Sequence, residues 1–293
     1  MNELYGVDPE APMDIRDLKA LLDRFGLANG RFIGRYPDDW VAMLESHFTR
    51  FKDVDRARLN RLLVLHKDAF LSTPATYMRS KTWPVNASKA KGTEVRFHKI
   101  FAREGNDADL PTLSSYLWDS DEDVGASRGS HIQMTASAYA NACRPLFEWS
   151  SEVHLADRFF QLRRGDGQID RNRSAVLRDL LRCANKLGHC QTFFLHFESV
   201  KHLSEKEYEA GLIRDLQQLA DEAGIRTSGP DAMMINYDIH DSLGHGRYIF
   251  SIKGGLQFDH GFDLDRQKLN HVHWLGSGEL LPIHQLFGLA LRS

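Results

Sequence analysis

Residues 174–197, SAVLRDLLRCANKLGHCQTFFLHF, decide the fold of the second half of the chain. Ser174 to Leu187 places apolar side chains at helical spacing, and Gln191 to Phe197 has the apolar and aromatic density of a buried strand. A helix that leads directly into a buried strand is typical of a sheet covered by helices. The stretch therefore predicts an α/β arrangement for this half.

The flanking segments extend this pattern in both directions. Upstream, Glu152 to Phe160 (EVHLADRFF) is typical of a strand, and downstream Ser204 and Glu207 form a capping-box pair that opens a helix ending at Ala223. Further strands are expected at 232–239, 247–252 and 256–258, with Gly254-Gly255 as the last turn, before the closing segments 271–275 and 282–291. The order β-α-β-α-β-β-β predicts a mixed β-sheet covered by helices.

The first half of the chain has helical spacing instead. Helices are expected at 14–25, 37–51, 54–70 and 135–149. Pro145 can kink the last of these or end it early, and the polar stretch 120–130 is typical of a surface loop. We therefore expect a mainly helical N-terminal domain over 1–149 and the sheet domain over 150–293, which gives an α+β or α/β fold class.

Composition limits the classes of partner. The 293 residues carry a net charge of −3, so a nucleic acid contact must come from a local basic patch. Cys143, Cys183 and Cys190 form no CxxC motif and predict buried free thiols in a reducing compartment. The first residues, MNELYGVDPEAPMD, are acidic, and no run reaches the roughly 18 apolar residues of a membrane span. A cytoplasmic protein without a transmembrane segment is expected.

His245 and Arg247 are the first candidate site residues. They stand two apart at the expected start of a strand, which predicts that both side chains point to one face. An imidazole beside a guanidinium suits a phosphodiester, because the first can attack phosphorus or move a proton and the second binds two oxygens. The alternative is an ordinary surface pair on an edge strand, and spacing alone does not decide between them.

The segment 236–263, NYDIHDSLGHGRYIFSIKGGLQFDHGFD, resembles the phospholipase D superfamily. It is most similar to the phospholipase D-like domain at the C-terminus of MIT-domain proteins and its bacterial relatives. The matching elements are His245, Arg247 and Tyr248, the turn Gly254-Gly255, and the ending Gly261-Phe262-Asp263. More loosely, the resemblance covers 150–293, where Asp157-Arg158-Phe159 ends the first strand. It implies a phosphate site containing these residues.

Two departures from the family bear on catalysis. Active members have a lysine where this chain has Arg247, and an aspartate where it has Ile252. Arginine keeps the phosphate contact, whereas loss of the aspartate removes the group that would orient the imidazole. Active members also use two histidines, so cleavage would need a homodimer that joins two copies of His245, or a second histidine. The candidates within the chain are His260, His240 and His154.

The loop RFFQLRRGDGQIDRNR, residues 158–173, is a second candidate site. Its five arginines outnumber its two aspartates, and it directly follows the first expected strand. The arginines are Arg158, Arg163, Arg164, Arg171 and Arg173. Together with Phe159 and Phe160 they suit a phosphate backbone with stacked bases or sugars. The alternative is a solvated loop with internal salt bridges, in which at least one phenylalanine belongs to the core.

Histidines and aspartates also crowd into residues 238–273. They are Asp238, His240, Asp241, His260, Asp263, Asp265, His271 and His273. Such side chains suit Zn, Mn or Fe, but no recognised ligand spacing such as HExxH is present. We therefore expect no metal and no other cofactor.

Three functions remain open. The favoured one is a nucleic acid-binding protein with a degenerate phospholipase D-like site, which the resemblance places in bacterial phage defence or mobile elements. The second is a metal-independent phosphodiesterase or nuclease that acts through His245, as a homodimer. The third is a protein-interaction scaffold with a vestigial pocket. In the binding and scaffold hypotheses, the helical N-terminal half contacts a protein partner.

Overall fold

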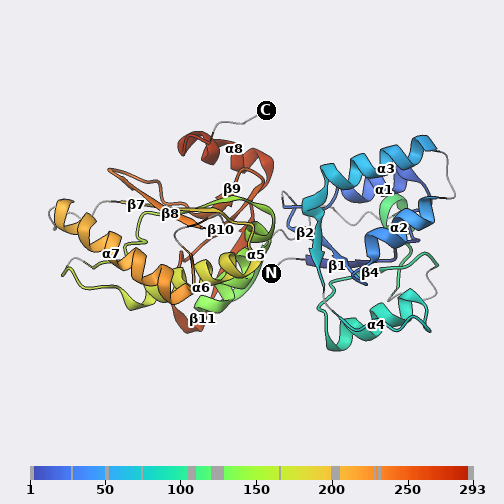
Figure 1. The fold of residues 1–293 in the computed structure, drawn as a ribbon, viewed down its shortest axis with the longest axis horizontal. Coiled ribbons are helices and arrows are strands. Elements are labelled where there is room, and N and C mark those ends of the chain that lie inside the picture. Colours follow the sequence, from blue (N-terminus) through green and yellow to red (C-terminus); the bar gives the residue numbers. More distant parts are fainter. Residues whose placement is uncertain are drawn as a thin grey trace. The chain divides into compact units, whose positions relative to one another are not determined.

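A computed structural model describes residues 3–27, 29–49, 53–73, 75–104, 110–119, 129–164, 166–198, 205–226, 229 and 232–289. The chain forms two compact units, Asn2–Ala126 and Ser127–Ser293 (Figure 1). The expected boundary at 149/150 is therefore wrong. That boundary would assign strand β5 (Gly129–Met134) and helix α5 (Ala136–Trp149) to the N-terminal unit. Both belong to the C-terminal unit, where β5 pairs with another strand of the sheet and α5 packs against the following helix.

The N-terminal unit is built on a parallel sheet with strand order β3-β2-β1-β4. Its strands are β1 (Glu3–Val7), β2 (Arg31–Arg35), β3 (Phe70–Ser72) and β4 (Ile100–Phe101). Its α-helices are α1 (Ile15–Leu22), α2 (Trp40–Phe48), α3 (Asp53–Leu65) and α4 (Trp83–Thr93), with short helical turns at Lys67–Ala69 and Ser115–Asp119. The expected helices are present, but the expectation of a mainly helical domain is wrong because this sheet lies between them.

Both faces of the N-terminal sheet are covered. Figure 1 shows α1, α2 and α3 on one side and α4 on the other. The Asp14 side chain accepts the backbone N–H groups of Arg16 and Asp17, which starts α1 with its apolar face toward the core. The Trp40 indole N–H donates to the Val7 carbonyl at 2.6 Å and so joins α2 to the end of β1. On the other face, Tyr36 packs in a cluster with Trp83 of α4.

The C-terminal unit contains a seven-stranded mixed sheet with the order β5-β11-β10-β9-β6-β7-β8. The remaining strands are β6 (Glu152–Asp157), β7 (Thr192–Glu198), β8 (Met234–His240), β9 (Arg247–Ser251), β10 (Gly254–Phe258) and β11 (Asp265–Trp274). Strands β6, β7 and β8 are parallel, and the β6–β9, β9–β10, β10–β11 and β11–β5 pairs are antiparallel. Both units are mixed α/β structures, which confirms the expected fold class.

Helices cover this sheet on two sides (Figure 1). They are α5, α6 (Arg171–Leu187) and α7 (Glu205–Ala223) on one face and α8 (Ser277–Leu286) on the other. Phe193 of β7 contacts Phe147 of α5, whereas Phe250 of β9 lies with Leu280 and Ile283 of α8. The odd-numbered residues of β6 thus face α5 and α6, and the even-numbered residues face α8.

Several local expectations need correction. The turn between β9 and β10 is Ile252-Lys253, and Gly254 and Gly255 lie inside β10. A Cβ on Gly255 would lie 2.9 Å from the Phe250 Cβ and 3.0 Å from Leu280, so glycine there allows α8 to pack closely on the sheet. Helix α5 continues through Pro145 to Trp149. The capping residue Ser204 lies outside the described residues.

The expected cytoplasmic location is inferred in part from free cysteines and from the lack of a membrane span. Cys143, Cys183 and Cys190 are all free; Cys143 and Cys190 are buried as expected, whereas Cys183 is only partly buried. Within the described parts of the chain, no helix combines the length and apolar character that crossing a bilayer requires. The cytoplasmic location stays a prediction.

Candidate functional site

The parallel strands β6, β7 and β8 end at one edge of the C-terminal sheet, where ligands of open α/β sheets commonly bind. Strand β6 ends at Asp157, whose carboxylate accepts the Phe159 backbone N–H at 2.9 Å and whose carbonyl accepts that of Phe160 at 2.9 Å. This turn sends the two aromatic rings in different directions. Phe160 is buried in the core, as expected for one of the pair, whereas Phe159 is 46% exposed.

Two guanidinium groups lie over the Phe159 ring. The Cζ atom of Arg158 is 4.9 Å from the ring centroid and that of Arg247 is 5.8 Å from it. We call Arg158, Phe159 and Arg247 the arginine–phenylalanine cluster. Arg158 donates to the Glu198 carboxylate at 3.2 Å, and Arg247 donates to the Asp259 carbonyl, so other strands and turns hold both cations in place.

A buried carboxylate lies beneath the cluster. Asp157 pairs in register with Arg247 and is 4% exposed. Burial raises the pKa of Asp157, while the Phe159 backbone N–H and then the charges of Arg247 and Arg173 act in the opposite direction. Gly261, with φ +64°, passes so close that a Cβ there would lie 2.6 Å from the Arg247 Cδ and 2.7 Å from the Asp157 Oδ2. The arrangement therefore depends on a glycine at this position.

The other arginines of the loop have separate environments. Arg163 makes a two-point ion pair with Asp215 of α7, at 2.7 and 2.8 Å, and donates to the Gly167 carbonyl. Arg173 donates to the Gln161 carbonyl at 3.3 Å and lies 3.9 Å from Asp263.

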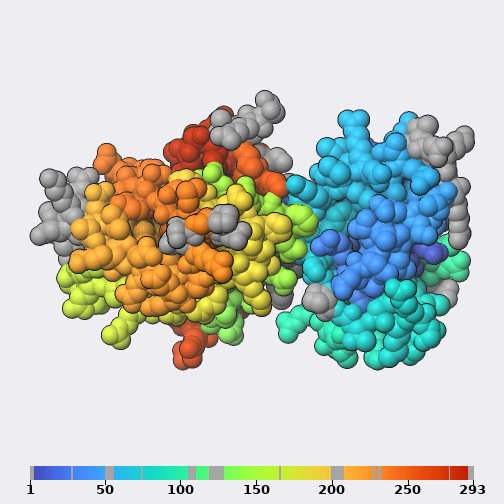
Figure 2. Space-filling model, viewed as in Figure 1, coloured from blue at the N-terminus to red at the C-terminus, as the bar shows by residue number. Residues whose placement is uncertain are grey.

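Arg164 and Arg171 are exposed, the first beside Asp166 and the second at the start of α6. Figure 2 shows the loop, in yellow-green, at the surface of the C-terminal unit. Arg163 is thus held by an ion pair with α7, and Arg164 with Asp166 forms a salt bridge within the loop. Of the five loop arginines, Arg158 is the one whose guanidinium lies over Phe159 together with that of Arg247.

His245 does not occupy the expected position on a strand. Strand β9 begins at Arg247, and His245 is exposed in the preceding loop, where it makes no hydrogen bond or ion pair with a described residue. Because His245 lies before the strand, the alternation of side-chain direction along β9 does not place His245 and Arg247 on one face. Tyr248 faces the α8 side, next to Ala156, and burial followed by the charge of Glu279 raises the pKa of its hydroxyl.

The candidate second histidines lie elsewhere. His260 is exposed in the turn after β10, with its backbone N–H donated to the Asn270 side chain. His154 and His240 both contact His196 on β7. Each of these three histidines thus has its own hydrogen-bond partner. Ile252, which stands at the aspartate position of the family motif, lies in the hairpin turn and is 46% exposed.

Sequence reasoning missed Glu198, the residue that holds Arg158. Its carboxylate also accepts the Leu243 backbone N–H at 2.8 Å, which fixes the loop before β9. A signal was present, because Glu198 ends β7 as Asp157 ends β6, and neighbouring parallel strands finish at the same edge.

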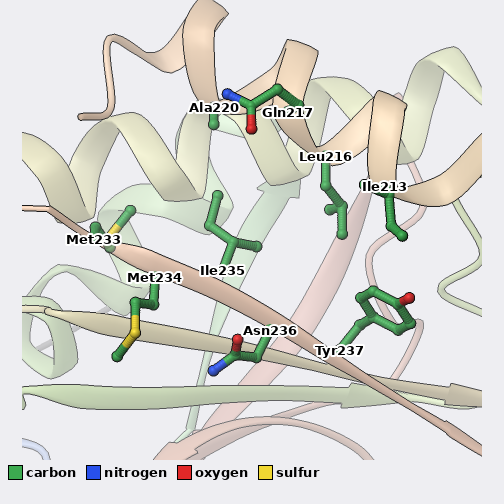
Figure 3. A pocket seen from close by; sticks show the side chains of 9 residues that line it. All are labelled: Ile213, Leu216, Gln217, Ala220, Met233, Met234, Ile235, Asn236 and Tyr237. Atoms are coloured by element: carbon green, nitrogen blue, oxygen red, sulfur yellow. The ribbon is translucent and has the colours of Figure 1, made fainter. Parts of the chain in front are cut away.

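Two pockets lie elsewhere on the sheet. One of about 280 Å³ is enclosed by α7 and strand β8 (Figure 3), and it is lined by Ile213, Leu216, Gln217, Ala220, Met233, Met234, Ile235, Asn236 and Tyr237. None of these side chains is charged, so none of them supplies a cation to an anionic ligand. The other, of about 210 Å³, lies between α8 and the loop around His245, with Gly244, Gly246 and Tyr248 in its wall.

Comparisons with known proteins give no family. No family model and no curated protein matches the chain. Among solved structures the chain is similar to TrmBL2, an archaeal chromatin protein described as showing a novel mode of DNA binding. The identity is 10%, the match covers 85% of this chain and 78% of TrmBL2, and the TM-score is 0.27. A similarity of this size supports no conclusion about fold or function.

Proposed function

We propose that the C-terminal unit binds single-stranded nucleic acid through the arginine–phenylalanine cluster. The observation that carries the proposal is the Phe159 ring, 46% exposed at the edge of three parallel strands, with two guanidinium groups over it. Proteins that bind single strands combine aromatic rings, on which bases stack, with cations that follow the backbone. The cluster offers one such ring, that of Phe159, and two such cations, Arg158 and Arg247.

The charges around the cluster limit the affinity. Glu198 pairs with Arg158, and Asp157 lies beside Arg247. Each guanidinium has more N–H groups than its present partners use, so a phosphate can be added without breaking these contacts. The chain as a whole is negative, at −3, and repels a polyanion elsewhere. We expect binding of short single strands that weakens steeply as salt is added.

The resemblance to phospholipase D-like domains fits binding better than cleavage. Arg247 keeps the phosphate-binding role of the family motif. His245 has no described partner to orient its imidazole, which a nucleophile or proton shuttle needs. The phosphodiesterase activity, the homodimer, the protein partner of the N-terminal unit and the role in bacterial defence all stay predictions.

The test is fluorescence anisotropy with a labelled single-stranded oligonucleotide over a range of salt. Phe159→Ala should weaken binding about 5- to 100-fold and leave the salt dependence unchanged, because it removes stacking and no charge. Arg247→Ala should weaken binding and reduce the slope of log K against log salt by about 1. Arg164→Ala is the matched control, since it removes the same charge from a loop arginine beside Asp166 and away from the ring.

Three results would contradict the proposal. Affinity that does not change with salt would remove the electrostatic contribution. An effect of Arg164→Ala as large as that of Arg247→Ala would mean that an arginine contributes by its charge alone and not by its position in the cluster. Equal binding by wild type and Phe159→Ala would exclude stacking on this ring.

A further inference from the structure

A chain of hydrogen-bonded side chains crosses three parallel strands on the α8 face of the sheet. His154 of β6 has its Nε2 3.0 Å from the Glu152 carboxylate and its Nδ1 2.9 Å from the Nε2 of His196 on β7. The Nδ1 of His196 lies 3.1 Å from the Nε2 of His240 on β8. We call Glu152, His154, His196 and His240 the histidine chain.

The carboxylate at one end sets the position of every proton in the chain. Glu152 only accepts, so the Nε2 of His154 must carry the proton that it shares with this carboxylate. The Nδ1 of a neutral His154 is then an acceptor and takes the N–H of the His196 Nε2. His196 is consequently left with an unprotonated Nδ1, whose lone pair points away from β6 toward β8.

That lone pair meets a carboxylate. Asp238 pairs in register with His196, and its Oδ2 lies 3.3 Å from the His196 Nδ1. His196 is 3% exposed, so this nitrogen is shielded from solvent by the surrounding side chains. Without an ion, this Nδ1 accepts the N–H of the His240 Nε2 at 3.1 Å, and the Asp238 carboxylate lies beside that contact. A cation can take the place of this proton when His240 carries its proton on Nδ1, and it then has both nitrogens and the carboxylate as ligands.

We propose that His196, Asp238 and His240 bind a divalent transition-metal ion, with Zn²⁺ the ion that the donor set suits best. Two imidazole nitrogens and one carboxylate oxygen form a common zinc set that leaves a fourth position for water. With metal–ligand bonds of about 2.0–2.1 Å, tetrahedral ligand atoms stand roughly 3.3 Å apart. The observed separations from the His196 Nδ1 are 3.1 and 3.3 Å, and all three ligand atoms lie within 4.8 Å of one another.

The surroundings also suit a metal site. Zinc-bound histidines usually donate their other N–H to an acceptor, and His154 with Glu152 supplies this support to His196. The Asp238 side chain is 57% exposed, which leaves a path from solvent. The Phe287 ring, 4.5 Å from the His196 ring and 5.8 Å from the His240 ring between centroids, provides an apolar wall.

A second group of potential ligands serves as a comparison. Asp259, His271 and His273 also bring three ligand atoms within 4.8 Å, and the His271 Nδ1 lies 3.4 Å from the Asp259 carboxylate. None of the three is buried, and the structure places no oriented chain like Glu152–His154 behind them among the described residues. This group is therefore the internal control for exposed histidines and carboxylates.

The experiment is a calorimetric titration of Zn²⁺ into the untagged, chelator-treated full chain. Wild type should take up one ion per chain, and His240→Ala should lower the affinity at least 100-fold. His273→Ala should leave the affinity unchanged within about twofold. Glu152→Gln keeps the shape of the side chain but weakens the orientation of His154, and should cost on the order of 10- to 100-fold. With Co²⁺ in place of Zn²⁺, wild type should show the intense visible absorption of a tetrahedral site and His240→Ala should not.

Two further outcomes would overturn the proposed ion site, and a third would overturn the supporting role given to Glu152 and His154. Wild type that binds no Zn²⁺ more tightly than His240→Ala would mean that the three groups do not act together. Loss of the site in His273→Ala instead of His240→Ala would place the ion at the other cluster. Normal affinity in Glu152→Gln, together with loss in His240→Ala, would refute the orienting role of the histidine chain.

Discussion

Gly261→Ala tests whether the backbone at this turn positions Arg247. The expected loss of stability has two parts, one from the backbone conformation and one from packing. A non-glycine residue at φ +64° costs roughly 1 kcal/mol in backbone energy. The new Cβ would also lie 2.7 Å from the buried Asp157 carboxylate and 2.6 Å from the Arg247 side chain, an overpacking that typically costs about 1–3 kcal/mol. The total expected loss in the free energy of unfolding is about 2–4 kcal/mol.

Gly188 provides a matched control in the same unit. Its φ is +71°, and a Cβ there would meet nothing within 4 Å, so Gly188→Ala should cost only the backbone part, about 1 kcal/mol. Hydrogen exchange measured on peptides from β6 and β9 reads the opening of the C-terminal unit alone. Because Arg247 must also move away from Phe159, oligonucleotide binding should fall in Gly261→Ala and stay unchanged in Gly188→Ala. Equal losses of stability in the two variants would refute the close contact at Gly261.

Two further predictions concern buried polar groups of the same region. Asn270 is fully buried, donates to the Gly261 carbonyl at 2.8 Å and accepts the His260 N–H at 3.0 Å. Asn270→Leu should therefore destabilise the C-terminal unit by about 2–4 kcal/mol, as measured by hydrogen exchange. A loss below about 0.5 kcal/mol would contradict these bonds. Burial raises the pKa of Asp157 above its ordinary value of 3.8, so the folded state holds this proton more tightly than the unfolded state, and the contribution of Asp157 is lost as pH rises through its folded pKa. The stability of wild type relative to Asp157→Asn should therefore decrease from about pH 3 to pH 7 in urea unfolding, and a constant difference would count against a raised pKa.

The sequence predicted the elements that have strong local patterns. Helices α1, α2 and α6 show one apolar face, and their buried leucines and aromatics lie where the spacing put them. The strands β1 (ELYGV) and β2 (RFIGR) were missed because both are short and have no alternation of polar and apolar residues. Strand β5 was missed for another reason. It is polar, and its partner β11 lies more than a hundred residues later in the chain.

The candidate site was harder to predict because it depends on partners that are distant in sequence. Five arginines in one loop look equivalent until Asp215 of α7 holds Arg163 and Glu198 of β7 holds Arg158. Likewise, the histidines and aspartates between 238 and 273 show no recognised ligand spacing, and His196, one of the three ligands of the proposed ion site, lies outside that segment. The register between β7 and β8, which sets His196 opposite Asp238, is not visible in the sequence.

The pairing of β5 with β11 has a practical consequence for dividing the chain. A fragment cut at residue 150 would lose β5 and α5 together. The backbone amides and carbonyls of the ten-residue β11 would then be open along the sheet edge, and the part of the helical cover that α5 supplies would be missing. Such an edge invites association with other chains. A fragment that begins near residue 127 keeps the strand that closes this side, so the second unit is best separated from the first ahead of β5.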